Sequence, residues 1–167
     1  GSERTTRLLA WGGSRRLAAV DLERAGPGDY RARRQVIRAG DDLWLILDRA
    51  SGLTDTSATT SWTLGPGVDL SSGPTSGSYR LRSLRGSDAA SLTFAGSEGT
   101  SFSTFHGSMD PFAGWHVVRS QPVATTAVRV EQPGPETWLA TVIFPLACAM
   151  MPSTTAKPRP EPLPTSL

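Results

Sequence analysis

Short apolar stretches recur along the chain at intervals of roughly 8 to 12 residues, and Gly, Pro, Ser and Asp separate them. Helical periodicity is almost absent. This pattern predicts an all-β fold with strands at 15–25, 30–37, 43–48, 59–64, 78–84, 90–94, 101–105, 115–119, 123–130 and 137–144. We expect an antiparallel β-sandwich with two large stacked sheets, because several short strands separated by turn signals are typical of that architecture.

Segment 15–25 carries two conflicting signals. Its Leu, Ala and Glu residues favour a helix by intrinsic propensity. Ala18, Val20 and Leu22 nevertheless alternate with polar or small residues, as they would in a strand. We assign the segment to a strand, because a lone helix would be out of place in so regular a β pattern.

Alternation also predicts which strand faces are buried. In residues 79–82 the apolar side chains take one face and the arginines take the other, as expected for a half-exposed strand. Segments 43–47 and 138–144 are apolar on both faces. We therefore expect these two strands at the centre of a sheet that is covered on both sides, with Trp44 and Trp138 serving as packing residues.

The length of 167 residues suits one domain. Residues 1–2 resemble the remnant of a cleaved affinity tag, 3–150 form the predicted sandwich domain, and 151–167 form a Pro-rich tail that we expect to be disordered. The chain lacks an initiator Met, so we expect a segment of a longer protein. No apolar run approaches the roughly 20 residues of a membrane span, so no membrane partner is expected.

Charge adds one feature to this picture. The net charge is +2, and the tail contributes Lys157 and Arg159 against Glu161, so the predicted domain is close to neutral. Every basic residue before position 157 is Arg, which binds carboxylates and sulfates with two parallel donors. A GC-rich coding sequence is the simpler explanation, and a polyanion-binding face is the alternative. Nucleic acid is not expected, because no dense basic run with interleaved aromatics is present.

The sequence contains no complete catalytic set. His106, Asp110 and His116 are residue types that bind zinc, but their spacing matches no recognised metal motif, so they are weak candidates and we expect no metal or cofactor. Cys148, the single cysteine, is expected to be an inert buried thiol; it excludes an internal disulfide. The compartment therefore stays open between periplasmic, secreted and cytoplasmic locations.

Exposed aromatic rings are the usual platforms of sugar-binding modules, since a flat ring covers the apolar face of a pyranose. The candidates for exposed rings are Trp11, Trp62, Trp115 and Tyr79. We expect at most one of them to be a ligand platform, because sandwich cores routinely bury several large aromatics.

Residues 28–36 (GDYRARRQV) and 41–52 (DDLWLILDRASG) resemble the C-terminal β domain of heparinase II/III-like polysaccharide lyases. In that family a Tyr precedes a His-Arg-Arg-type strand, which turns into an apolar strand ending in Asp and a Gly-bearing turn. The later segments 61–67, 111–115 and 138–145 follow in the family's order. The resemblance spans most of residues 15 to 146 and rests on the order of motifs that are individually short.

The resemblance implies a function for the longer protein. Such lyases pair a catalytic α/α toroid with this β domain and cleave uronic-acid polysaccharides, glycosaminoglycans among them, by β-elimination. This chain alone is then expected to be inactive and to have the toroid and an acidic polysaccharide as partners. The alternative from a different class is a stand-alone carbohydrate-binding or adhesion module.

The resemblance also assigns residues. Tyr30, Arg34 and Asp48 match framework positions, and we expect Arg34 to be partly buried and paired with Asp48. Ala32, Thr63 and Thr56 stand where the family often has His, so no catalytic residue is assigned to this chain. The candidate substrate-binding residues are Arg33, Trp62 and Trp115.

Overall fold

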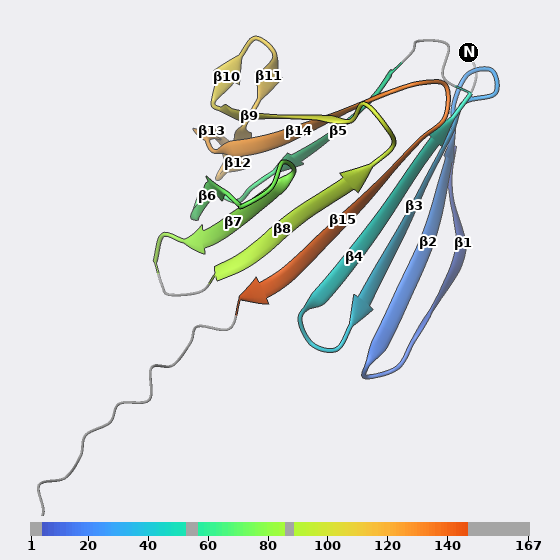
Figure 1. Ribbon diagram of the computed structural model, residues 1–167, viewed down its shortest axis with the longest axis horizontal. Coiled ribbons are helices and arrows are strands. Elements are labelled where there is room, and N and C mark those ends of the chain that lie inside the picture. Colours follow the sequence, from blue (N-terminus) through green and yellow to red (C-terminus); the bar gives the residue numbers. More distant parts are fainter. Residues whose placement is uncertain (1–4, 53–56, 86–88, 147–167) are drawn as a thin grey trace, which may run out of the picture.

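The computed structural model of the chain describes residues 5–52, 57–85 and 89–146 (Figure 1). Every regular element there is a strand, and every strand pairing is antiparallel, which confirms the predicted fold class. The described residues therefore contain no helix that could cross a membrane. The predicted tag remnant, the Pro-rich tail, Cys148 and Thr56 lie outside these ranges.

Eight strands form the large sheet in the order β1-β2-β3-β4-β15-β8-β7-β6. Their bounds are β1 Thr5–Gly13, β2 Leu17–Ala25, β3 Arg31–Ala39, β4 Leu43–Ser51, β15 Thr137–Leu146, β8 Ala89–Gly96, β7 Ser78–Ser83 and β6 Val68–Ser72. The first four strands follow one another as hairpins. The last strand of the chain, β15, then inserts between β4 and β8, so the sheet joins the two ends of the described chain.

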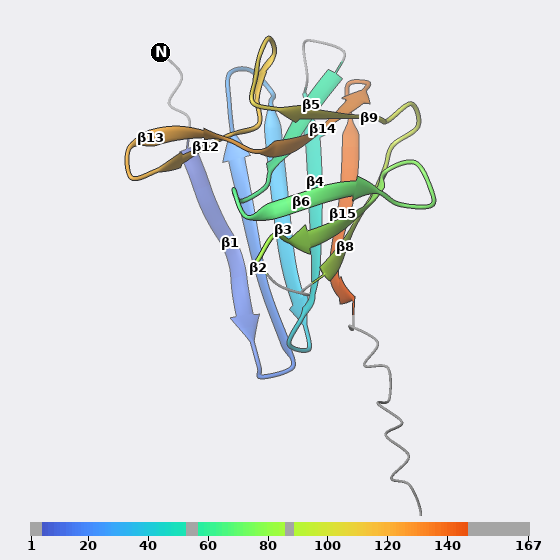
Figure 2. The same ribbon diagram turned by 90° about the vertical axis from the view of Figure 1, so that its left-hand side faces the viewer.

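A second, smaller sheet of three strands lies over one face of the large sheet, which we call the inner face (Figure 2). Its order is β5-β14-β9, with β5 at Ser57–Thr63, β14 at Thr126–Pro133 and β9 at Ser101–His106. Two short hairpins complete the described fold. They pair β10 (Ser108–Met109) with β11 (Phe112–Ala113), and β12 (Trp115–Val118) with β13 (Gln121–Ala124).

The hydrophobic core lies where the two sheets overlap. Leu92 and Leu139 from the large sheet are almost completely buried against Val128 and Val130 of β14. Phe94 is at the centre of an aromatic cluster, with ring centroids 5.9 to 6.3 Å from those of Phe102, Tyr79 and Trp62. The core is thus centred on β15 and β8, the strands that lie beneath the small sheet.

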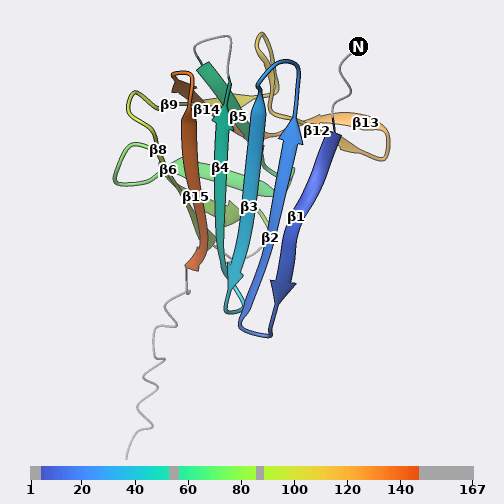
Figure 3. The ribbon, with the colours of Figure 1, turned by 90° about the vertical axis from the view of Figure 1, so that its right-hand side faces the viewer.

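The expectation that segments 43–47 and 138–144 are covered on both sides is wrong for the described part of the chain. Their inner faces contribute Ile46 and Leu139 to the core. Their outer faces carry Leu45, Leu47 and Val142, and no described element lies over them (Figure 3). The apolar pattern is present on both faces, but no element among the described residues covers the outer face.

The exposure of several aromatic side chains also differs from the expectation. Tyr79 is 8% exposed and belongs to the core, whereas Trp44 and Trp138, expected as packing residues, are 40% and 47% exposed. The two tryptophans are exposed because no described element lies over their parts of the large sheet. An apolar strand in a sequence predicts a buried strand, yet both tryptophans lie on parts of the sheet that the small sheet does not reach.

The ambiguous segment 15–25 forms a strand over Leu17–Ala25, as its alternation predicted. It pairs with β1 on one side and β3 on the other, so its backbone donors and acceptors serve two ladders. Sheet pairing outweighs helix propensity here because propensity is a weak preference that tertiary contacts override.

Truncating a residue at the centre of the core tests this packing. Leu139→Ala removes a side chain with no exposed surface and should lower the free energy of unfolding by about 2–5 kcal/mol. Leu84→Ala is the control, because Leu84 is 66% exposed and its loss should change the free energy by less than about 0.5 kcal/mol. Urea unfolding followed by circular dichroism measures both, and equal effects would contradict the proposed core.

Candidate functional site

A row of polar and aromatic side chains crosses the outer face of the large sheet. Glu23 of β2 is directly opposite Arg33 of β3, which is opposite Arg49 of β4, which is opposite Trp138 of β15. Directly opposite residues share a face of the sheet, so the four side chains project together. With neighbouring strands about 4.8 Å apart, the distance from Arg33 to Trp138 is roughly 10 Å.

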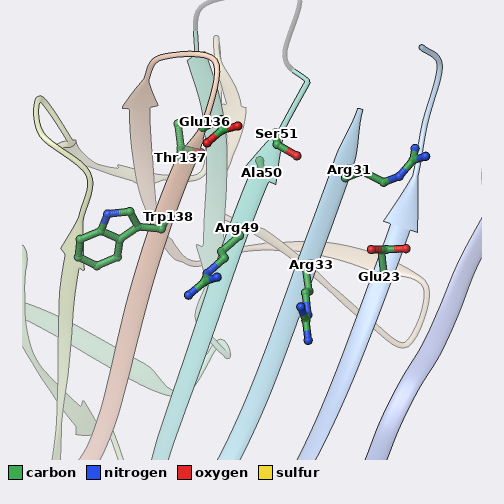
Figure 4. A pocket seen from close by; sticks show the side chains of 9 residues that line it. All are labelled: Glu23, Arg31, Arg33, Arg49, Ala50, Ser51, Glu136, Thr137 and Trp138. Atoms are coloured by element: carbon green, nitrogen blue, oxygen red, sulfur yellow. The ribbon is translucent and has the colours of Figure 1, made fainter. Parts of the chain in front are cut away.

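These residues line a shallow pocket of about 680 Å³, which we call the outer pocket (Figure 4). Arg31, Ala50, Ser51, Glu136 and Thr137 complete its wall. Figure 4 shows Arg49 between Trp138 and Arg33, while Arg31 extends in the opposite direction, toward β2. The pocket is therefore built at one end of the sheet, where β2 and β4 end and β3 and β15 begin.

Two of the pocket's charged groups already have partners. Arg33 donates to both carboxylate oxygens of Asp21, with Nε 2.9 Å from Oδ1. This guanidinium holds the pKa of Asp21 below its usual value of 3.8, and the carboxylate raises the pKa of Arg33. Glu23 is likewise paired with Arg7, whose Nη2 lies 2.7 Å from Oε1.

Arg49 is in a different electrostatic setting. It lies directly across from the like-charged Arg33, an arrangement that destabilises a sheet. Among the described residues, neither Arg49 nor Arg31 forms an ion pair. Arg49 is exposed beside Trp138, so a planar cation with free donors lies next to a half-exposed flat ring.

A glycine allows close backbone packing at this end of the sheet. Gly52 follows β4 with a φ of +68°, in the left-handed region that side chains rarely adopt. A Cβ at this position would clash with the backbone of Asp29 and Tyr30, in the turn between β2 and β3. The absence of a side chain thus lets the end of β4, with Arg49, pack closely against the turn that precedes Arg31.

An inner pocket of about 380 Å³ lies on the opposite face of the same strands, beside β5. Tyr30, Ala32, Arg34 and Asp48 all line it, so the residues carried over from the family resemblance do converge. The family's imidazole at position 32 would face this space, where the chain has a methyl group. Thr63, the other substituted position, is instead exposed on the far face of the small sheet.

The expected pair of Arg34 and Asp48 is present. Nε lies 2.6 Å from Oδ1 and Nη2 lies 3.0 Å from Oδ2, a two-pronged contact that raises the pKa of Arg34. The Arg34 side chain is partly buried, as expected, with 48% of its surface exposed. Its guanidinium carbon lies 5.9 Å from the ring centre of Trp62, so the pair connects the large sheet to β5.

The three candidate substrate-binding residues lie in three different places. Arg33 lines the outer pocket, bound to Asp21. Trp62 packs against the core between the sheets. Trp115 belongs to the β12–β13 hairpin, where its Nε1 donates to the Ser108 carbonyl at 2.8 Å and its ring stacks on Phe112. The structure therefore does not bring them together as one site.

The structure also places the three weak metal candidates. His106 Nδ1 lies 3.3 Å from the Thr126 hydroxyl, and His116 is exposed on β12. Asp110 precedes Pro111 in the turn between β10 and β11. No group of three or more His, Cys, Asp or Glu side chains suited to a metal forms within the described ranges.

The sequence reasoning missed Arg49 and Trp138 as site residues. Trp138 was assigned to packing, and Arg49 was read only as part of a turn motif. Only the pairing of β4 with β15 brings positions 49 and 138 together, and no local pattern in the sequence indicates that pairing. In the inner pocket Asp48 is bound to Arg34, and in the outer pocket Glu23 is bound to Arg7, while Glu136 forms no ion pair among the described residues. The outer pocket is suited to binding an anion with an apolar face.

No protein-family model matches the sequence, and no curated protein matches it. Solved structures do match. A heparan sulfate lyase from Pedobacter heparinus superposes with a TM-score of 0.70 at 15% identity, over 84% of this chain and 21% of the lyase. Two heparinase III structures give TM-scores of 0.69 and 0.68 at 16% and 14% identity, with the same coverage. The chain thus shares their fold and spans about a fifth of their length.

The pair of Asp21 and Arg33 makes a prediction about pH. Because the folded-state pKa of Asp21 is depressed, the pair stabilises the protein above the usual value of 3.8, and this contribution is lost as the pH falls through the folded-state value. Asp21→Asn should therefore be less stable than the parent chain at pH 7. The difference should be smaller at pH 3 than at pH 7, because protonation of Asp21 removes the contribution of the pair. Urea midpoints at both pH values measure it, and a gap that stays constant contradicts the assignment.

Proposed function

We propose that this chain is the C-terminal β domain of a heparinase II/III-like polysaccharide lyase, joined in its parent protein to a helical toroid that carries the catalytic residues. The fold is the observation that carries the proposal. It matches a heparan sulfate lyase and two heparinase III structures over 84% of this chain, while covering 21% of theirs. The order of family-like motifs from position 28 to 145 supports the same assignment independently.

The chemistry of β-elimination explains why this part alone should be inactive. A base must remove the proton at C5 of the uronate while donors neutralise its carboxylate and the 4-linked sugar leaves. The inner pocket contains the Tyr30 hydroxyl and the Arg34 guanidinium, but Arg34 already donates two hydrogen bonds to Asp48. Ala32 provides no imidazole. The remaining groups must then come from another domain of the parent.

The outer pocket gives the domain a second role, contact with the acidic polysaccharide. Arg49 and Arg31 have donors without ion-pair partners in the described part of the chain, and a carboxylate or sulfate could accept two parallel hydrogen bonds from either. Trp138 offers a half-exposed ring of the kind that covers a pyranose face. A bound anion would also relieve the repulsion between Arg49 and Arg33.

The lyase assignment predicts activity in the parent protein and none in this chain. Incubation with heparan sulfate, heparin, chondroitin sulfate and alginate should produce unsaturated uronates only with the intact parent, seen as rising ultraviolet absorbance. Activity of the isolated chain would show that the site is complete within it. A parent protein that cleaves none of these polysaccharides contradicts the assignment.

The outer pocket predicts a separate binding phenotype. Titration calorimetry of the isolated chain with heparin should show binding that Arg49→Gln or Trp138→Ala weakens at least tenfold, about 1.4 kcal/mol. Arg80→Gln is the matched control, because Arg80 is exposed on the outer face of β7, away from the pocket. No binding by the unaltered chain, or equal loss in all three variants, contradicts the assignment of the pocket.

The pocket also favours a second candidate function, that of a stand-alone carbohydrate-binding module. The two functions differ in what the intact protein does. A module would bind the glycan while the parent protein left it uncleaved, whereas the lyase assignment requires cleavage by the parent.

A further inference from the structure

The inner face of the large sheet is only partly covered. In Figure 2 the small sheet crosses in front of the upper part of the large sheet, and β6 and β7 cross in front of the middle of β3 and β4, whereas the lower ends of β1 and β2 have no described element in front of them. A groove of about 660 Å³ follows this uncovered area. Its walls come from β1 to β4 and include Trp11, Val20, Val36, Arg38 and Trp44. We call it the open groove.

The open groove continues the hydrophobic core outward. Trp44 shares the inner face of β4 with the buried Ile46, and Val36 lies directly opposite Ile46 on β3. Yet Trp11 is 79% and Trp44 40% exposed. An apolar surface that runs without a break from a core into solvent is typical of a face that another element covers.

Arg38 indicates what that element carries. It lies on the groove floor opposite Trp44, and its guanidinium forms no ion pair among the described residues. An unpaired guanidinium favours an occupant that brings a carbonyl or carboxylate oxygen to it, because hydrogen bonds from a charged donor are the strong ones. Apolar side chains on either side of that oxygen would fill the space between the two indoles.

The edges of the two sheets indicate the shape of the occupant. β1 is a nine-residue edge strand in which every residue is exposed, and its only charged side chain, Arg7, pairs with Glu23. Proteins normally protect such an edge with charges, Pro or a covering element, and β1 lacks a free charge. β5 is one of the two edges of the small sheet and lies beside the inner pocket, on the same face of the large sheet as the groove. A β-strand can use such edges, whereas a sugar chain cannot form a strand ladder.

We propose that an extended segment of the parent polypeptide, from outside these 167 residues, lies in the open groove and completes the second layer of the sandwich. The segment presents apolar side chains to Trp11 and Trp44 and an acceptor oxygen to Arg38. This proposal rests on the proposed function, since it takes the parent to be several times longer, as the matched lyases are. It goes beyond that function by assigning a structural partner to this face.

The test compares thiol reactivity in the isolated chain and in the intact parent protein. In a Cys148→Ser background, Ala18→Cys places a thiol on the groove floor, opposite Arg38. Ser103→Cys places a thiol on the exposed outer side of β9 and is the matched control. Modification by a maleimide should be fast at both positions in the isolated chain. In the parent it should slow at least tenfold at position 18, and by a smaller factor at position 103.

Each other outcome overturns the proposal. An equally fast reaction at position 18 in the parent shows that the groove is open. Protection in the isolated chain that grows with protein concentration assigns the groove to a second copy. Protection that appears only when heparin is added assigns it to the glycan. Lyase activity is measured separately, so a failure of the groove proposal is distinguishable from a failure of the lyase assignment.

Arg38 provides a second measurement. Arg38→Gln should leave the thermal midpoint of the isolated chain nearly unchanged, because Arg38 forms no ion pair in the described residues. The same change should lower the midpoint of the β domain in the intact parent, where its acceptor would lose a partner. Equal shifts in the two proteins would contradict an acceptor supplied from outside this chain.

Discussion

A sheet of eight strands has two faces to bury, and the described chain supplies three strands to cover part of one of them. Most features of the structure depend on this imbalance. Where the sheets overlap, Leu92, Leu139, Val128 and Val130 exclude water and stabilise the fold. Where they do not, the same apolar strands meet solvent. The outer pocket and the open groove both lie on parts of the sheet that no described element covers.

The strand content could be predicted because period-two alternation and turn residues are local signals. They placed β2 correctly against its helix propensity, and they placed the β3–β4 hairpin around Gly40. β1 was not predicted. Two adjacent leucines, a bulge between Leu8 and Ala10, and the Gly12–Gly13 pair disturb its alternation. The number of strands in each sheet also could not be predicted from the sequence, because local patterns do not indicate how many strands join one sheet.

In the candidate site, contacts within one hairpin could be predicted from the sequence, whereas contacts between strands distant in sequence could not. The pairing of Arg34 with Asp48 could be predicted, since both residues belong to one hairpin whose register its turn fixes. The row from Arg33 to Trp138 could not, because the last strand joins β4 across nearly ninety positions. A pattern of apolar residues also cannot distinguish a strand that its own domain buries from one that another domain buries. That ambiguity is why Trp138 was interpreted as a core residue.

The distribution of the tryptophans has a consequence for spectroscopy of this domain. Of the five indoles in the chain, only Trp62 packs against the core, while Trp11, Trp44 and Trp138 are substantially exposed in the folded state. Intrinsic fluorescence will therefore resemble that of solvated indole before any unfolding begins, and it will report weakly on loss of the core. The same three indoles are well placed to report on whatever approaches the open groove or the outer pocket, so their emission is a natural probe of docking rather than of folding.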